Sequence, residues 1–357
     1  MVYWILIFIA ILTYPLCNKK IALVGFGKNK IIKTRGLQWY LLLNGTLSIL
    51  IVGLRHVEIG RDTAMYLYKF NKVNNYEHFF SAIESEKTEV GYSILEFIVG
   101  RVFSFEGFQI IVAIISIIPL FYIIYKYSKI PWLSIFIFIT FGFLSFNMLA
   151  MRQAVALGIT TFSYKYIMER KFMKFIICII LAFSFHLSAI IFLPAYWFGN
   201  IKFTKYTKHI SLIVIFFAFI LKERIFLFVN LYARLPYSYL EAGGEKMYIF
   251  VLFSVILGLI YDSGYQDKAR FNKTLLFMII AVAIIWPIAS FHPGVFRLYY
   301  YYSIFLVLFI PNIIELINNK VIKRYIYMVY IIVGSYYLIT QIILRDNNMN
   351  PYYFFWN

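Results

Sequence analysis

The chain has 357 residues, of which 62% are hydrophobic, and its mean hydropathy is +0.78. This composition excludes an ordinary soluble domain and predicts a polytopic membrane protein. In a soluble protein the net charge of +18 would point to nucleic acid. Here lysine- and arginine-rich cytoplasmic loops beside anionic membrane lipid explain the charge, so we expect membrane lipid and no nucleic acid as a partner.

Apolar segments that could each cross or enter a membrane recur along the whole chain. They occupy residues 2–17, 37–54, 107–125, 132–147, 152–168, 173–186, 188–199, 210–222, 247–261, 274–291, 297–316 and 325–344. We therefore predict an all-α, polytopic integral membrane helical bundle with about 12 transmembrane helices, which forms a single integral membrane domain over residues 1–357. The segment 93–105 is apolar at helical spacing but carries charge, so an interfacial or re-entrant position is expected for it.

The distribution of basic residues predicts the orientation of these segments. Residues 19–35 carry six basic side chains and no acidic one, so this loop is expected to be cytoplasmic. Alternation along the chain then places residues 55–93 outside, as one large extracytoplasmic loop. The turns near Arg152, His186 and Arg297 fall on the same outer face, and so do both termini.

The polar segment 55–93 is rich in acids, because half of the chain's sixteen acidic residues lie between Glu58 and Glu106. Asp62 precedes a helical pattern, so its carboxylate is interpreted either as a helix N-cap or as an acid/base group. Arg55 and Arg61 flank Asp62 and could orient it. Glu89 is the second carboxylate candidate.

Three further side chains sit at membrane depth on the same predicted face, namely Arg152, His186 and Arg297. An arginine near hydrocarbon costs several kcal/mol unless it is paired or reaches the interface, and such residues often mark ligand sites. The guanidinium of Arg152 or Arg297 could bind phosphate through two parallel hydrogen bonds. Each arginine could instead contact lipid phosphate at the interface. His186 could be a hydrogen-bonded core residue, a proton-transfer group or a donor to a phosphate oxygen.

Motifs that would indicate other chemistry do not occur in the sequence. The chain has no Asp-x-Asp, no glycine-rich phosphate loop, no His-Glu-x-x-His and no Gly-x-Ser-x-Gly. Cys17 and Cys178 are interpreted as small core residues. We therefore expect no metal site and no cofactor.

Taken in order, several short motifs resemble the EpsG family of Wzy-like exopolysaccharide and capsule polymerases. They are Arg55 with Gly60-Arg61-Asp62-Thr63, Glu89-Val90-Gly91-Tyr92, Arg152-Gln153-Ala154, Phe185-His186-Leu187-Ser188 and Arg297 with its tyrosines. The resemblance implies a multi-pass protein of the bacterial cytoplasmic membrane that joins undecaprenyl-diphosphate-linked oligosaccharide repeat units on the outer face of that membrane. It also implies, as partners, a chain-length regulator and a flippase of the same pathway.

On this interpretation the protein is a metal-independent glycosyltransferase for capsule, exopolysaccharide or O-antigen biosynthesis. Asp62, Glu89 and His186 are the catalytic candidates. The candidates for binding substrate or diphosphate are Arg152, Arg297, Arg55, Arg61 and Gln153. The alternatives are a transporter or flippase for the same lipid-linked glycan, which would need charges along a path across the membrane, and a membrane acyltransferase, which would need a histidine on the cytoplasmic side.

Overall fold

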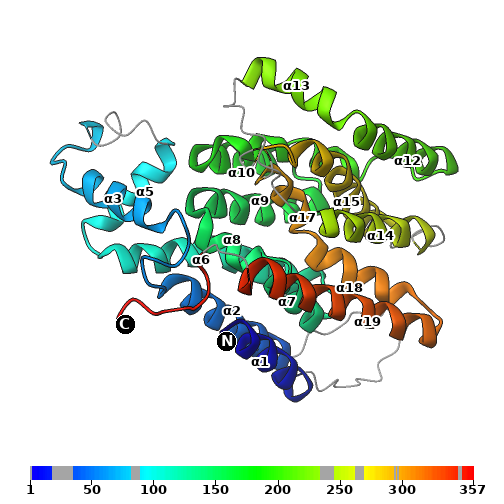
Figure 1. Ribbon diagram of the computed structural model, residues 1–357, viewed down its shortest axis with the longest axis horizontal. Coiled ribbons are helices and arrows are strands. Elements are labelled where there is room, and N and C mark those ends of the chain that lie inside the picture. Colours follow the sequence, from blue (N-terminus) through cyan, green and yellow to red (C-terminus); the bar gives the residue numbers. More distant parts are fainter. Residues whose placement is uncertain are drawn as a thin grey trace.

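The computed structural model describes residues 2–17, 35–81, 89–233, 245–261, 269–292, 295, 297–344 and 348–357. Over these residues the chain is all-α, as predicted, and most helices lie roughly parallel or antiparallel to one another (Figure 1). The helices are α1 (Val2–Cys17), α2 (Arg35–Gly53), α3 (Thr63–Asn74), α5 (Val90–Gly100), α6 (Phe105–Tyr127), α7 (Pro131–Thr140), α8 (Phe143–Leu149), α9 (Met151–Glu169), α10 (Phe172–Phe185), η1 (Leu187–Phe192), α11 (Ala195–Phe198), α12 (Lys205–Ile220), α13 (Lys222–Ala233), α14 (Glu245–Tyr261), α15 (Ala269–Ala289), η2 (Arg297–Tyr299), α17 (Tyr300–Ser303), α18 (Leu306–Leu316), α19 (Lys320–Tyr337) and η3 (Leu338–Ile343).

Few of these helices satisfy the length and composition of a full membrane span. Within the described ranges, three do so, namely Arg35–Gly53, Phe105–Tyr127 and Arg297–Leu316. The pair α7 and α8 adds a fourth if it is counted as one span bent by 44°. The other apolar helices are shorter, so the prediction of about 12 spans is not confirmed.

The bend between α7 and α8 falls inside a segment that we predicted as one helix, residues 132–147. Gly142 has a φ of +80°, a left-handed conformation that a glycine adopts without steric cost, and it ends the regular helix after Thr140. A second break follows at Ala150, between α8 and α9. This break makes Arg152 the second residue of α9 and places its side chain at one end of the bundle.

Charged groups lie at both ends of the bundle. At the Arg152 end, the loops and helix starts carry acidic and basic groups together. At the opposite end, which we call the Lys126 end, Lys126 and Lys171 both contact Glu169, at 3.2 Å and 2.8 Å. These two lysines hold the pKa of the Glu169 carboxyl low, at about 2. Helix α9 connects the two ends with 19 residues, which corresponds to roughly 28 Å.

Much of the predicted extracytoplasmic loop is helical in the structure. Helix α3 and helix α5 pack together at the Arg152 end, beyond the ends of α9 and α10 (Figure 1). Their shared core contains Tyr66, Phe70 and Tyr92. Phe70 and Tyr92 contact Phe108 of α6, and Tyr66 contacts Tyr92. The single large loop is therefore not confirmed, and residues 82–88 of it lie outside the described residues.

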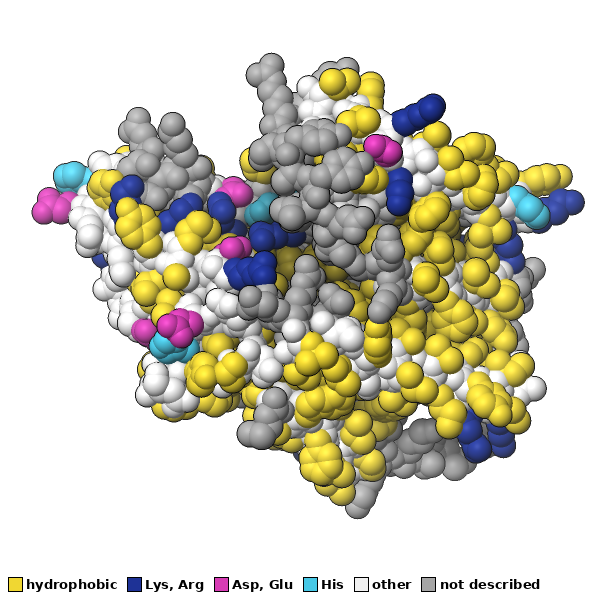
Figure 2. Space-filling view, in the orientation of Figure 1, with side chains coloured by type: hydrophobic (Ala, Val, Ile, Leu, Met, Phe, Trp, Pro, Cys, Tyr) yellow, Lys and Arg dark blue, Asp and Glu magenta, His cyan; other side chains and the backbone are white. Residues whose placement is uncertain are grey.

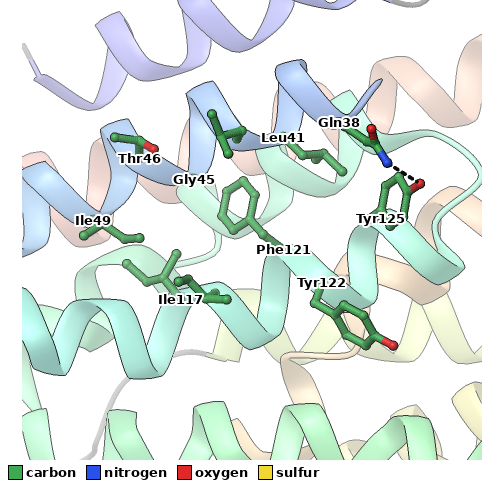
Figure 3. Close-up of a pocket in the computed structure, with 11 residues that line it drawn as sticks. Gln38, Leu41, Gly45, Thr46, Ile49, Ile117, Phe121, Tyr122 and Tyr125 are labelled. Atoms are coloured by element: carbon green, nitrogen blue, oxygen red, sulfur yellow. Dashed lines mark hydrogen bonds between the residues drawn. The ribbon is translucent and has the colours of Figure 1, made fainter. Parts of the chain in front are cut away.

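A groove of about 340 Å³ runs between α2 and α6 in the half of the bundle nearer the Lys126 end (Figure 3). Gly45 and Phe121 lie at its centre, and Gln38 donates a hydrogen bond to the Tyr125 hydroxyl at one end of it, at 3.1 Å. Among the described residues, no charged side chain lines the groove. It is therefore separate from the charged groups at the Arg152 end.

Candidate functional site

The turn that carries Arg55 to Asp62 is fixed against the break between α8 and α9. Arg55 is buried, with 1% of its surface exposed, and its guanidinium donates hydrogen bonds to the carbonyl oxygens of Val52 and Met148. Gly60 has a φ of +90°, and a Cβ atom there would lie 2.7 Å from the Met148 carbonyl oxygen. The turn therefore requires glycine at residue 60, both for its conformation and for this close approach.

The last residues of the chain hold the same turn from its other side. The backbone amide of His56 donates to the carbonyl of Tyr353 at 3.0 Å, and the amide of Phe355 donates to the carbonyl of Leu54 at 3.0 Å. Gly60 also donates to the carbonyl of Asn348, at 3.1 Å. Residues 348–357 thus form a C-terminal strap over residues 54–60, which the sequence analysis did not anticipate.

Arg152 and Glu89 form a close ion pair between Nη1 and Oε2. The hydroxyl of Tyr66, on α3, shares a hydrogen bond with the same guanidinium. The Arg152 and Glu89 side chains are only 24% and 13% exposed, so this is a largely desolvated pair. Arg152 therefore joins α9 to both helices of the α3 and α5 pair.

Arg297 and Asp62 form a second, looser pair, with 3.3 Å between Nη2 and Oδ2. Asp62 occupies the N-cap position of α3, yet its side chain makes no capping hydrogen bond, so the carboxylate is directed to Arg297 instead. The Arg297 and Asp62 side chains are 43% and 29% exposed. Gln153 supports the pair, because its Nε2 donates to the backbone carbonyl of Arg297 at 2.9 Å.

His186 lies at the break between α10 and η1, in a chain of polar contacts. Its Nδ1 atom lies 2.6 Å from the Ser188 hydroxyl, which in turn lies 3.0 Å from the Tyr301 hydroxyl. The charges of Glu89, Arg152 and Arg297 all act on the imidazole, so His186 belongs to the same electrostatic cluster as both arginines.

A close helix contact brings Glu89 toward His186. A Cβ atom at Gly91 would lie 2.4 Å from the Ser184 hydroxyl oxygen and 2.9 Å from the Ser184 carbonyl oxygen. The first turn of α5 can therefore approach the last turn of α10 only because residue 91 is glycine. Glu89 and His186 each lie two residues from this contact.

The structure therefore brings together six of the eight residues singled out from the sequence: Asp62, Glu89, Arg152, Gln153, His186 and Arg297. Of the other two, Arg55 is buried behind the turn, where it binds backbone carbonyls, and Arg61 is exposed beside Asp62. Figure 2 shows acidic, basic and histidine side chains gathered on this face, next to the part formed by α3 and α5.

Three residues of the site were not among the candidate site residues, namely Tyr66, Ser188 and Tyr301, although Ser188 and Tyr301 lie within the motifs that carry the resemblance. Each is an uncharged side chain among many tyrosines or serines, and only tertiary contacts distinguish it. Over the described ranges, no group of three or more His, Cys, Asp or Glu side chains is arranged to hold a metal ion.

Comparison with known proteins supports the resemblance that the motifs indicated. Searches of curated protein sequences and of solved structures gave no match. The model of the EpsG family matches residues 38–354, which is nearly the whole chain and includes every site residue described above. The chain therefore belongs to the EpsG family.

Proposed function

We propose that the protein is a polysaccharide polymerase that joins lipid-diphosphate-linked oligosaccharide repeat units. The EpsG family is associated with polymerase-like membrane proteins of polysaccharide biosynthesis. The observation that carries the proposal is the convergence of two arginine–carboxylate pairs, Arg152 with Glu89 and Arg297 with Asp62, around His186. The arginines supply fixed positive charge for a diphosphate, and the carboxylates supply proton acceptors.

In the proposed reaction a hydroxyl of the acceptor glycan attacks the anomeric carbon of the donor glycan. The new carbon–oxygen bond forms as the bond from the anomeric carbon to the diphosphate oxygen breaks, and the diphosphate leaves with the electron pair. The acceptor proton passes to a carboxylate. Arg152 and Arg297 stabilise the negative charge that develops on the diphosphate, because guanidinium groups bind phosphate oxygens in a fixed, charge-assisted geometry.

We assign the proton acceptor to Asp62 and an orienting role to Glu89. Asp62 is more exposed than Glu89, and its contact with arginine is longer. Glu89 is held in a close, largely desolvated pair, so it has less freedom to approach an incoming hydroxyl. Arg297 has further N–H groups beyond the one that faces Asp62, so it can bind a phosphate oxygen without releasing that carboxylate.

The distribution of charge favours an enzyme over a transporter or flippase. In the part of the chain that the structure describes, the only buried charged side chains are Arg55 and Glu96. Both lie at the Arg152 end, Arg55 after α2 and Glu96 on α5. A path for a charged headgroup would require such groups along the length of the bundle, whereas catalysis requires them at one end.

The proposal extends to partners and location. The donor would be an undecaprenyl-diphosphate-linked oligosaccharide in the cytoplasmic membrane of a bacterium, with the Arg152 end outside. A chain-length regulator and a flippase of the same pathway would act with it, and the reaction would need neither a metal nor a nucleotide.

The direct test uses purified protein and a lipid-linked repeat unit. We expect a ladder of longer lipid-linked products in the presence of EDTA and without added nucleotide. The matched control is Arg152→Ala protein at equal concentration, which should give no ladder. Movement of the intact repeat unit across a vesicle membrane without any ladder would support the flippase instead.

A further inference from the structure

We propose that His186 acts as a neutral hydrogen-bond donor through Nε2–H, and that Ser188 and Tyr301 position it. The inference rests on the proposed function, because it assigns His186 the diphosphate oxygens as its acceptor. Of the two functional roles expected for His186, it selects donation to a phosphate oxygen over proton transfer, since a histidine that donates from a fixed Nε2–H does not take the acceptor's proton.

The direction of the hydrogen bonds at Nδ1 fixes the tautomer. The backbone amide of Ser188 donates to His186 Nδ1, at 3.3 Å. A backbone N–H can only donate, so Nδ1 carries no hydrogen, and in the neutral ring the hydrogen is on Nε2. The Ser188 hydroxyl, at 2.6 Å from the same atom, must then also donate to it. The Tyr301 hydroxyl lies 3.0 Å from that of Ser188 and donates in turn to the serine oxygen.

The surroundings favour donation to an anion. The charged groups that act on the ring are Glu89 from the start of α5, Arg152 from α9 and Arg297 from η2. The Ser188 hydroxyl contacts Nδ1, and the Tyr301 hydroxyl contacts that of Ser188. The Glu89 carboxylate already accepts a hydrogen bond from Arg152. An anion held between the two arginines would therefore lie within the same cluster as Nε2–H. Such a donor binds a developing negative charge without carrying a charge itself.

Protonation of Nδ1 would oppose the hydrogen bonds that this atom accepts. The charges of Glu89, Arg152 and Arg297 act on the ring, and the imidazolium forms in acid. The imidazolium keeps its Nε2–H but can no longer accept hydrogen bonds from Ser188 at Nδ1, so the positioned donor is lost as the pH falls through the pKa of His186. We expect the rate of ladder formation to fall as the pH is lowered through the pKa of His186. A variant that lacks the imidazole should not show this fall.

Two substitutions at His186 separate its two nitrogen atoms. In His186→Gln the side-chain amide nitrogen lies near the former position of Nε2, whereas in His186→Asn it lies near that of Nδ1. We expect His186→Gln to retain the ladder rate within about 10-fold, and His186→Asn and His186→Ala to lose roughly 10²–10³-fold, as when one donor to a developing oxyanion is removed. Equal losses in the glutamine and asparagine variants, at matched folding and expression, would overturn the donor role.

A second measurement reports on the ring directly and does not need turnover. Ring-nitrogen NMR of ¹⁵N-histidine protein, with the His186 signals assigned by their loss in His186→Gln, should show the Nε2–H tautomer at neutral pH. Titration with farnesyl diphosphate should shift the Nε2 signal, and farnesol should not shift it. An Nδ1–H tautomer, or no shift with the diphosphate, overturns the inference. If these signals behave as expected but wild-type protein makes no ladder, the diphosphate contact stands and the polymerase proposal fails.

Discussion

Arg152 at the start of α9 and Glu89 just before α5 form an ion pair although 63 positions separate them in the chain. Tyr66 on α3 bonds to the same guanidinium. The pair thus holds the site's most buried cation at the junction between the α3 and α5 pair and the rest of the bundle. Breaking such a desolvated pair by removing one partner leaves the other charge buried and typically costs about 3–5 kcal/mol.

Arg152→Lys should keep the protein in the membrane yet lose most ladder formation, and Arg152→Ala should lose at least as much. Lysine keeps the charge but not the planar group that reaches Glu89, Tyr66 and a phosphate oxygen together. Loss of one charged contact to a developing anion costs roughly 10²–10³-fold in rate. Ladder length and rate are measured at matched expression, with Arg324→Lys at the Lys126 end as the control. Wild-type rates in both Arg152→Lys and Arg297→Lys would contradict the phosphate-binding role.

Asp62→Asn should lower the ladder rate more than Glu89→Gln does. Asparagine cannot take a proton, and removal of a general base typically costs roughly 10²–10⁴-fold. Glutamine can still accept a hydrogen bond from Arg152, so we expect a loss of roughly 10-fold from the weakened pair. Single-turnover rates with saturating lipid-linked substrate make the comparison. The reverse order of losses would transfer the proton acceptor to Glu89.

The sequence was sufficient to predict the helical class, and six of the residues that it singled out lie together in the structure, because charges inside an apolar chain are conspicuous. It could not show which cation pairs with which carboxylate. Arg55 and Arg61 flank Asp62 in sequence, yet Arg297 is its partner, because the Arg55 side chain is turned into the α8–α9 break. The turn around Ala150 lies between two predicted segments and was expected, whereas the break at Gly142 was missed, since an apolar run gives no signal for a bend within it.

Removal of the last six residues, by truncation after Pro351, should destabilise the Arg55–Asp62 turn and abolish most ladder formation. The deletion removes Tyr353 and Phe355, whose backbone groups pair with His56 and Leu54. Each such hydrogen bond contributes about 0.5–1.5 kcal/mol net, and the loss of the strap also exposes buried groups around Arg55. Thermal unfolding and ladder rate are measured together, with deletion of Asn357 alone as the control. Unchanged unfolding and unchanged rate would mean that the strap is not needed to hold the turn.

The Arg152 end should face the outside of the cell and the Lys126 end the cytoplasm. Two exposed residues report on this, Glu77 at the first end and Lys129 at the second. In a background without Cys17 and Cys178, a membrane-impermeant thiol reagent should label Glu77→Cys in intact cells and Lys129→Cys only after permeabilisation. The opposite pattern would place the site on the cytoplasmic side, where a lipid-linked polymerase of the proposed kind could not use it.

Gly91→Ala should lower the ladder rate without removing any group that carries chemistry. A Cβ atom at this position would lie 2.4 Å from the Ser184 hydroxyl oxygen, so α5 must move away from α10 to accommodate it. Added atoms at such a contact cost about 1–3 kcal/mol. Because Glu89 is paired with Arg152, a displacement of about 1 Å would also move the proposed phosphate contact relative to His186, which is expected to cost roughly 10²-fold in rate.

A second substitution tests this explanation of the Gly91→Ala effect. Ser184→Ala removes the nearer clashing atom but leaves the backbone carbonyl oxygen 2.9 Å from the added Cβ, so the double variant should regain only part of the rate. Val90→Ala, at an exposed position one residue earlier, is the control for the helix itself and should match wild type. Ladder rates are compared at equal folded protein, measured by thermal unfolding in detergent. A wild-type rate in Gly91→Ala, or no improvement on adding Ser184→Ala, would show that the close contact between α5 and α10 does not set the distance from Glu89 to His186.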